Sequence, residues 1–154
     1  VVDDWNSLIA AMNSFQETGI IVFANGNDYL DNHNGEYYDS SYMASLPYFY
    51  QQLEEAWLSV NYAELSHIIN EDGKLIYTRW EVHGNKCGTA KPYCLTVNGK
   101  HIYGAFKNDE GEAIYAYLSG SSFGAPMVSG GIALLSQAFP NHTPGQIRNR
   151  ILAF

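Results

Sequence analysis

Basic residues, cysteines and long apolar runs are all scarce in this chain of 154 residues. Eight lysines and arginines stand against sixteen acidic residues, which gives a formal net charge of −8. The few basic residues are scattered, whereas a nucleic-acid surface needs them clustered, so we expect no nucleic-acid partner. No stretch approaches the roughly 20 apolar residues that span a bilayer, so we expect no membrane span in this chain.

Only two cysteines, Cys87 and Cys94, are present. A local disulfide between them is sterically feasible and would suit an oxidising compartment. Two buried free thiols are an alternative. A zinc site would need further ligands, for which His83 and His101 are at best a loose match.

The acidic residues do not have the dense spacing of a calcium-binding loop. Asp28, Asp31, Asp39, Asp72 and Asp109 are dispersed along the chain, as is typical of solvated loop charge. A structural calcium site is therefore still possible, but no motif indicates one.

What the chain does contain is a serine in a run of small residues, Gly120-Ser121-Ser122-Phe123-Gly124-Ala125-Pro126. Apolar residues recur at helical spacing after Phe123, which predicts a central, buried helix. The hydroxyl of Ser122 would then lie at the helix mouth, where free N–H groups favour negative charge. An acyl-transfer enzyme needs its serine there, although a serine that only caps the helix is the alternative.

A second segment has the pattern of a strand with polar residues at its end. The apolar run 20–24 is typical of a buried parallel strand, and Asn25-Gly26-Asn27-Asp28 follows it. An asparagine amide is an uncharged donor of the kind used in oxyanion holes, which makes Asn27 a candidate. The alternative is an ordinary Asn-Gly turn.

The remaining pattern predicts an α/β fold, with a parallel sheet and a hairpin-rich insertion. A first helix is expected to be capped by Asp3 or Asp4 and stopped by Gly19. Further helices are expected over 46–56, from Phe123 and from Thr143, with Thr143 as the cap of the last one. Strands are expected over 20–24, 57–62, 75–82, 93–97, 101–106 and 114–118.

Together, and in this order, the two segments resemble those of the subtilisin-like serine proteases, the subtilase or peptidase S8 family. The serine signature of that family, Gly-Thr-Ser-Met/Phe-Ala-x-Pro, is matched from Gly120, and its Val-x-Ala-Ala-Gly-Asn strand is matched from Val22. The resemblance implies that Ser122 is the nucleophile, that Asn27 belongs to the oxyanion hole and that Gly26 lies along the substrate cleft.

This sequence departs from the two motifs of the family at three positions where the family has a small residue. Ser121 replaces a threonine, while Gly124 and Asn25 each replace an alanine.

The aspartate and histidine segments of the family, Asp-Thr/Ser-Gly and His-Gly-Thr, lie upstream of the oxyanion strand and do not occur here. The resemblance therefore implies a partial catalytic domain over residues 1–154, the C-terminal half of a parallel-sheet domain with helices on both faces. We expect a serine endopeptidase acting on polypeptides when the missing N-terminal half completes it, and an inactive isolated fragment. No cofactor is expected for catalysis.

None of the five histidines has a motif that would place it against Ser122 as an alternative base. They are His33, His67, His83, His101 and His142.

The stretch from Cys87 to Thr96 resembles a pattern in bacterial secreted and autotransporter subtilases, which have a similar cysteine pair. This resemblance favours the Cys87–Cys94 disulfide over the alternatives. It also implies a secreted or cell-surface protein.

Two further interpretations stay open at this stage. A noncatalytic subtilase-like binding module would keep the fold without the activity. An α/β-hydrolase esterase needs Gly-x-Ser-x-Gly, which Gly120, Ser122 and Gly124 satisfy. In that family, however, an acid and a histidine should follow the serine, and only His142 does.

Overall fold

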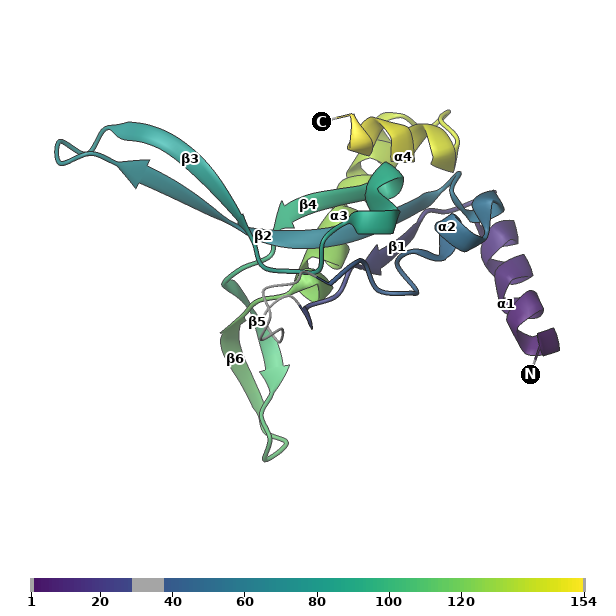
Figure 1. Ribbon diagram of the computed structural model, residues 1–154, viewed down its shortest axis with the longest axis horizontal. Helices are drawn as coiled ribbons and strands as arrows, with labels where there is room; N and C mark the ends of the chain where they lie inside the picture. The colour runs from purple at the N-terminus through teal and green to yellow at the C-terminus, as the bar shows by residue number, and fades with distance from the viewer. Residues whose placement is uncertain (1, 29–37, 154) are drawn as a thin grey trace.

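The protein is described by a computed structural model, which covers residues 2–28 and 38–153. The expectations for Asp31 and His33 lie outside these residues. In chain order the elements are α1 (Val2–Phe15), β1 (Ile21–Ala24), α2 (Leu46–Phe49), η2 (Gln51–Leu53), β2 (Trp57–Ile69), β3 (Leu75–Val82), η3 (Gly88–Tyr93), β4 (Cys94–Asn98), β5 (Ile102–Lys107), β6 (Ala113–Leu118), α3 (Ser121–Ala138) and α4 (Pro144–Leu152). Figure 1 shows helices packed around a small sheet, from which two hairpins project.

The centre of the sheet is β2, which pairs with three other strands. β1 and β4 run parallel to it, and β3 is antiparallel. Ala63 pairs with both Val82 of β3 and Asn98 of β4, so these two strands lie on opposite sides of β2. The predicted α/β fold is confirmed, and the sheet, predicted to be parallel, is partly so because β3 is antiparallel.

Successive side chains of β2 point to opposite faces of the sheet, and each face has its own core. On one face Leu58 and Val60 pack with Val128 of α3. On the other, Trp57 packs against residues of the N-terminal helices and of η3, namely Ile9, Leu46, Leu53, Ala90 and Tyr93. Helical elements therefore cover both faces, as predicted.

The two projecting hairpins are β2–β3 and β5–β6 (Figure 1). β2 continues to Ile69, beyond the predicted end at residue 62, because its second half pairs with β3 rather than with the core strands. β5 begins at Ile102, since His101 has a φ of 56° and lies in a turn. Several large apolar side chains on the two hairpins are half exposed or more, among them Trp80 and Tyr115.

The helix predicted over residues 46–56 is wrong in extent. The chain forms the short α2 and then η2, with a break at Tyr50, whose φ of −130° and ψ of 78° are not helical. The Tyr50 hydroxyl accepts a hydrogen bond of 2.7 Å from the indole of Trp5.

The expectation of a central, buried helix after the serine is also wrong among the described residues. Only Ser121, Gly124 and Val128 of α3 are buried, on the side that faces β1 and β2. Leu134, on another side of the helix, is 70% exposed. The helix thus has more apolar surface than the described residues bury.

The last helix, α4, begins as predicted, with Thr143 as its N-cap and Pro144 in its first turn. The Thr143 hydroxyl accepts a hydrogen bond from the Gln146 N–H, and the Gln146 side chain accepts one from the Thr143 N–H. This reciprocal pair is a capping box, which satisfies two otherwise unpaired N–H groups.

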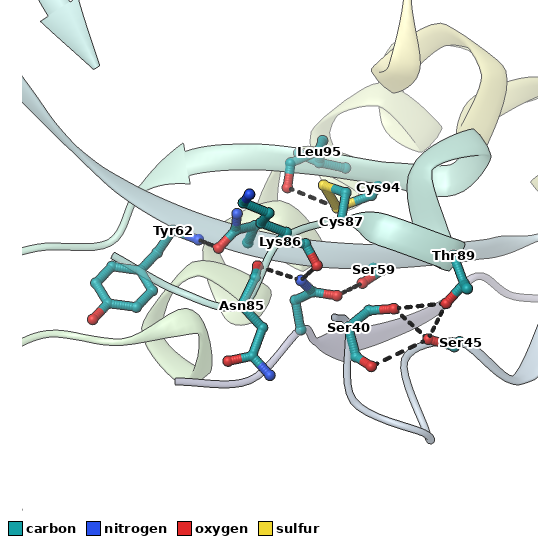
Figure 2. The surroundings of a disulfide bond; sticks show 12 residues. Ser40, Ser45, Ser59, Tyr62, Asn85, Lys86, Cys87, Thr89, Cys94 and Leu95 are labelled. Atoms are coloured by element: carbon teal, nitrogen blue, oxygen red, sulfur yellow. Dashed lines mark hydrogen bonds between the residues drawn. A yellow bond between two sulfur atoms is a disulfide. The ribbon is translucent and has the colours of Figure 1, made fainter. Parts of the chain in front are cut away.

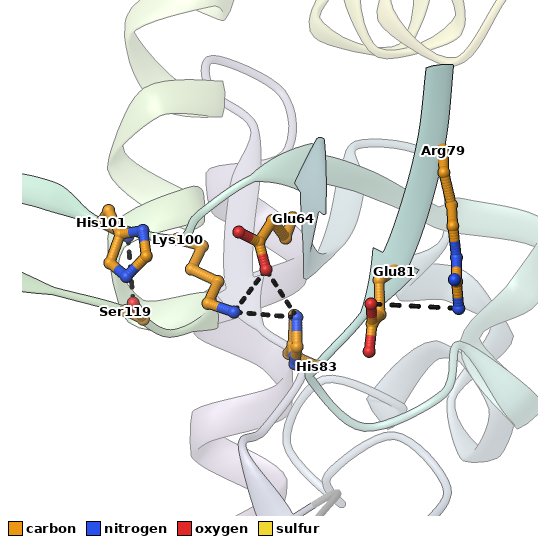
Figure 3. A network of polar contacts seen from close by, with 7 residues as sticks. All are labelled: Glu64, Arg79, Glu81, His83, Lys100, His101 and Ser119. Atoms are coloured by element: carbon orange, nitrogen blue, oxygen red, sulfur yellow. Dashed lines mark hydrogen bonds and ion pairs between the residues drawn. The ribbon is translucent and has the colours of Figure 1, made fainter. Parts of the chain in front are cut away.

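A polar cluster ties the base of the β2–β3 hairpin to the loop after β4 (Figure 3). Lys100 donates a hydrogen bond to the carboxylate of Glu64, and His83 Nε2 lies 3.4 Å from the same oxygen. The contact with Lys100, more than that with His83, lowers the pKa of Glu64 below its ordinary value.

Replacing Thr143 by alanine should lower the free energy of unfolding by about 1 kcal/mol, because the cap is lost. Urea denaturation of the chain measures the change. Thr143→Ser keeps the hydroxyl and should stay close to the parent. Equal losses in both variants would contradict the capping role.

Glu64→Gln should alter how stability depends on pH. Because the pKa of Glu64 is lowered in the fold, its ion pair stabilises the protein above pH 4.5 and is lost as pH falls through the lower folded-state pKa. The parent should therefore lose more stability than Glu64→Gln across that acidic window, as measured by thermal unfolding. Parallel curves for the two proteins would contradict this.

Candidate active site

Ser122 lies in the first turn of α3, where backbone N–H groups have no acceptor within the helix. The helix begins at Ser121, two residues before the predicted start. The side chain of Ser122 is exposed, and no hydrogen bond uses its hydroxyl within the described part of the chain. The structure therefore gives this hydroxyl access to solvent at the positive end of a helix.

The turn that leads into α3 is held by the backbone. Gly120 N donates a hydrogen bond of 3.0 Å to Gly99 O, in the loop that follows β4. A Cβ atom at Gly120 would lie 3.2 Å from Nδ2 of Asn27, which is tighter than most contacts in proteins. A residue without a side chain lets α3 begin close to the Asn27 amide.

Asn27 follows β1 and is fastened to the start of α3. Its Oδ1 accepts two hydrogen bonds from Ser121, of 2.8 Å from the backbone N and 2.9 Å from the hydroxyl. A backbone N–H can only donate, so the amide oxygen must face Ser121 and Nδ2 must face the other way. No hydrogen bond of the described residues uses Nδ2, and the Asn27 side chain is exposed. One amide donor is thus directed away from Ser121 and is open to solvent.

Gly26, the third residue predicted for this site, takes a backbone conformation that favours glycine, with a φ of 115°. A Cβ atom there would lie only 2.5 Å from the Asn85 side chain. Its N–H donates a hydrogen bond of 3.2 Å to the Ser121 hydroxyl. The role of Gly26 in substrate binding stays a prediction.

Two residues of this arrangement were missed by the sequence interpretation. Ser121, which is fully buried, looked like a small-for-small departure from the family pattern. Asn85 lies in the loop between β3 and η3, far along the chain, and no local signal links it to Asn27. Only the adjacency of Ser121 to the predicted nucleophile could have drawn attention to the first.

The four described histidines have partners other than Ser122. His83 contacts Glu64 and Lys100, while His101 donates through its backbone N to Ser119 Oγ (Figure 3). His67 lies 3.3 Å from the Thr78 hydroxyl on the β2–β3 hairpin, and His142 accepts from Arg150. No hydrogen bond joins a histidine to Ser122 in residues 2–28 and 38–153.

Cys87 and Cys94 are joined by a disulfide, with a Cα–Cα distance of 5.8 Å (Figure 2). The bond closes the segment that contains η3 and ends at the first residue of β4. Both cysteines are therefore oxidised, which overturns the free-thiol and zinc alternatives. Within the described chain, no group of three or more His, Cys, Asp or Glu side chains could hold a metal ion.

Burial raises the pKa of the Tyr62 phenol, at the point where β2 leaves the core. Its carbonyl accepts hydrogen bonds from the N–H groups of His83 and Gly84. Tyr62 and the Gly26 carbonyl both lie close to Gly84, at the same end of the sheet.

Comparisons with known proteins place this arrangement in context. The sequence model of the Subtilase family (Peptidase S8) matches residues 1–153 of this chain. Serotype-specific antigen 1 of Mannheimia haemolytica is 25% identical over 148 residues, which are 94% of this chain and 14% of that protein.

Two solved structures are similar in fold. The prenylagaramide maturation protease PagA matches with a TM-score of 0.55 and 25% identity, over 94% of this chain and 43% of that one. Sphericase matches with a TM-score of 0.58 and 19% identity, over 92% of this chain and 42% of that one. The chain therefore spans less than half of each of these proteins.

The family match decides against the α/β-hydrolase alternative, because it runs through both the strand before Asn27 and the helix that begins at Ser121. The chain belongs to the subtilase family and hence to a lineage of serine-type peptidases.

Proposed function

We propose that this chain contributes the nucleophile, Ser122, and one oxyanion donor, Asn27, to a secreted or cell-surface serine endopeptidase. The proposal includes an upstream half that supplies the aspartate and histidine of the triad. Without that half the chain is inactive. Residues 1–154 are in this view one part of a single catalytic domain.

The observation that supports the proposal best is the pair of hydrogen bonds from Ser121 to Asn27 Oδ1. They bring the segment after β1 to the first turn of α3, and no hydrogen bond among the described residues uses Nδ2 of Asn27 or the hydroxyl of Ser122. An amide donor bonded next to the serine, at the positive end of a helix, is the kind of arrangement that acyl transfer needs.

The chemistry follows from these groups. The Ser122 oxygen attacks the carbonyl carbon of a peptide bond while the upstream histidine takes its proton. The negative charge that forms on the carbonyl oxygen is stabilised by Asn27 Nδ2 and by a backbone N–H near Ser122. The histidine returns the proton to the leaving amine, and water then hydrolyses the acyl-enzyme.

Two surfaces support an upstream partner half. β1 pairs only with β2 among the described strands, so its other edge can accept a strand. Exposed apolar residues on α3, Met127 and Leu134, offer a second surface to cover. The solved relatives, of which this chain covers 42–43%, have enough additional chain to supply such a half.

The proposed location rests on the disulfide, which persists in oxidising environments. None of the described helices is long and apolar enough to cross a membrane. An autotransporter-like architecture for the complete protein remains part of the proposal.

A noncatalytic binding module is the second candidate. The observation that favours it is that no histidine among the described residues forms a hydrogen bond with Ser122, since a serine without a base is a weak nucleophile. Labelling of Ser122 in the presence of the upstream half separates the two candidates.

A fluorophosphonate probe should label the chain only after the upstream half is added, because the missing histidine must activate Ser122. Gel fluorescence and mass spectrometry measure the labelling. Ser122→Ala should abolish it, while Ser129→Ala, a serine on the same helix, should not. Labelling of the chain alone would contradict the inactive fragment, and no labelling of the mixture would favour the noncatalytic module.

In the active assembly, Asn27→Ala should lower kcat about 10²- to 10³-fold with little change in KM, a loss known for an oxyanion amide in this same protease family. Steady-state hydrolysis of a peptide substrate provides the measurement. Asn70→Ala, in the turn of the β2–β3 hairpin, serves as the control and should leave kcat unchanged. A change in KM alone would show that Asn27 binds substrate without stabilising the oxyanion.

A further inference from the structure

Asn85 forms hydrogen bonds on both sides of Asn27 along the chain. Its backbone N–H donates a hydrogen bond of 3.0 Å to Gly26 O, the residue before Asn27. Its side-chain Oδ1 accepts one of 2.7 Å from the N–H of Asp28, the residue after Asn27. The turn 26–28 is therefore held from one residue that is distant in sequence.

The amide of Asn85 is fully used. Besides the bond to Asp28 N–H, its Nδ2 donates to Asp28 Oδ2 at 3.2 Å and to Asp39 O at 3.0 Å. Asn85 itself is only 3% exposed, although its partners Asp28 and Asp39 are exposed residues. A side chain of other shape or polarity would lose the bonds to the Asp28 N–H and the Asp39 carbonyl.

Asn85 is itself held in place from the sheet. Asn25, which is fully buried, donates through Nδ2 to the carbonyls of Asn85 at 2.6 Å and Lys86 at 2.8 Å. Its Oδ1 accepts a hydrogen bond of 2.7 Å from Ser59 of β2. The next residue after Lys86 is Cys87, so the disulfide restrains the same segment (Figure 2).

We propose that Asn85 is a positioning residue of the active site, which fixes the turn 26–28 and so the place of the Asn27 amide. Asn85 makes no contact with reacting atoms in this proposal and acts only through Asn27. The inference rests on the proposed function, in which Asn27 Nδ2 stabilises the oxyanion.

The steric fit of the turn supports this role. Gly26 lies so close to the Asn85 amide that a Cβ atom would be 2.5 Å from Nδ2. With Ser121 bonded to Asn27 Oδ1 on one side and Asn85 bonded to the flanking backbone on the other, the amide has little freedom to turn. An oxyanion donor works best when its direction is set before the charge forms.

The test is a double-mutant cycle in the assembly of this chain with its upstream half. Asn85→Ala should lower kcat about 10-fold or more and change KM less than about 3-fold, because a misplaced oxyanion donor acts on the transition state. In the Asn27→Ala background the same substitution should change kcat less than about 2-fold, because the donor is already gone. Asn70→Ala is the matched control and should change neither constant.

Equal losses from Asn85→Ala in both backgrounds would overturn the proposal, since they would show an effect independent of Asn27. A kcat within about 2-fold of the parent would overturn it as well. If Asn85→Ala does not fold, Asn85→Asp takes its place in the cycle. That variant has nearly the same shape but loses both donors.

Failure of the proposed function has a different signature. If the parent assembly neither hydrolyses peptides nor labels at Ser122, the peptidase assignment fails, and Asn85 is tested by hydrogen exchange. The Asp28 amide, which donates to Asn85 Oδ1, should exchange faster in Asn85→Ala than in the parent, while the Ala24 amide within β1 should not. Unchanged exchange at Asp28 would overturn the positioning role.

Discussion

Parallel pairing of β1 and β4 with β2 is the constraint on which the rest of this structure depends. Because parallel strands end at the same edge of a sheet, the segments that follow β1 and β4 meet there. Gly99, just after β4, accepts the hydrogen bond from Gly120 that sets the start of α3. The Asn27 amide and the Ser122 hydroxyl owe their common location to this edge.

Polar side chains buried beneath that edge of the sheet favour one arrangement of the loops that follow the strands. Asn25 takes the place of a small apolar residue of the family pattern, yet it is fully buried and bonded to Ser59 and to the backbone of the loop before the disulfide. A buried amide that lost one of these partners would cost more than the bond itself, since desolvation would be uncompensated. The network therefore favours one arrangement of the loops around Asn27 over its alternatives.

The surfaces around this edge of the sheet leave many apolar side chains exposed. α3 buries only one side, and the hairpins β2–β3 and β5–β6 expose many apolar and aromatic side chains. Such exposure is unusual for a protein that is complete on its own, and it agrees with a chain that spans less than half of its solved relatives.

The sequence by itself determined the helices and strands whose signals are local. The run at 20–24 is a strand, Thr143 caps α4, and the order of motifs identified the family, because turn residues, caps and apolar period act within a few residues. The extension of β2 to Ile69 and the exposure of α3 could not be predicted from the sequence. Both depend on which other segments of the chain lie next to β2 and α3. Only the tertiary structure brought Ser121 and Asn85 to Asn27, as their hydrogen bonds join residues 57 to 95 positions apart, and no local pattern encodes such a distance.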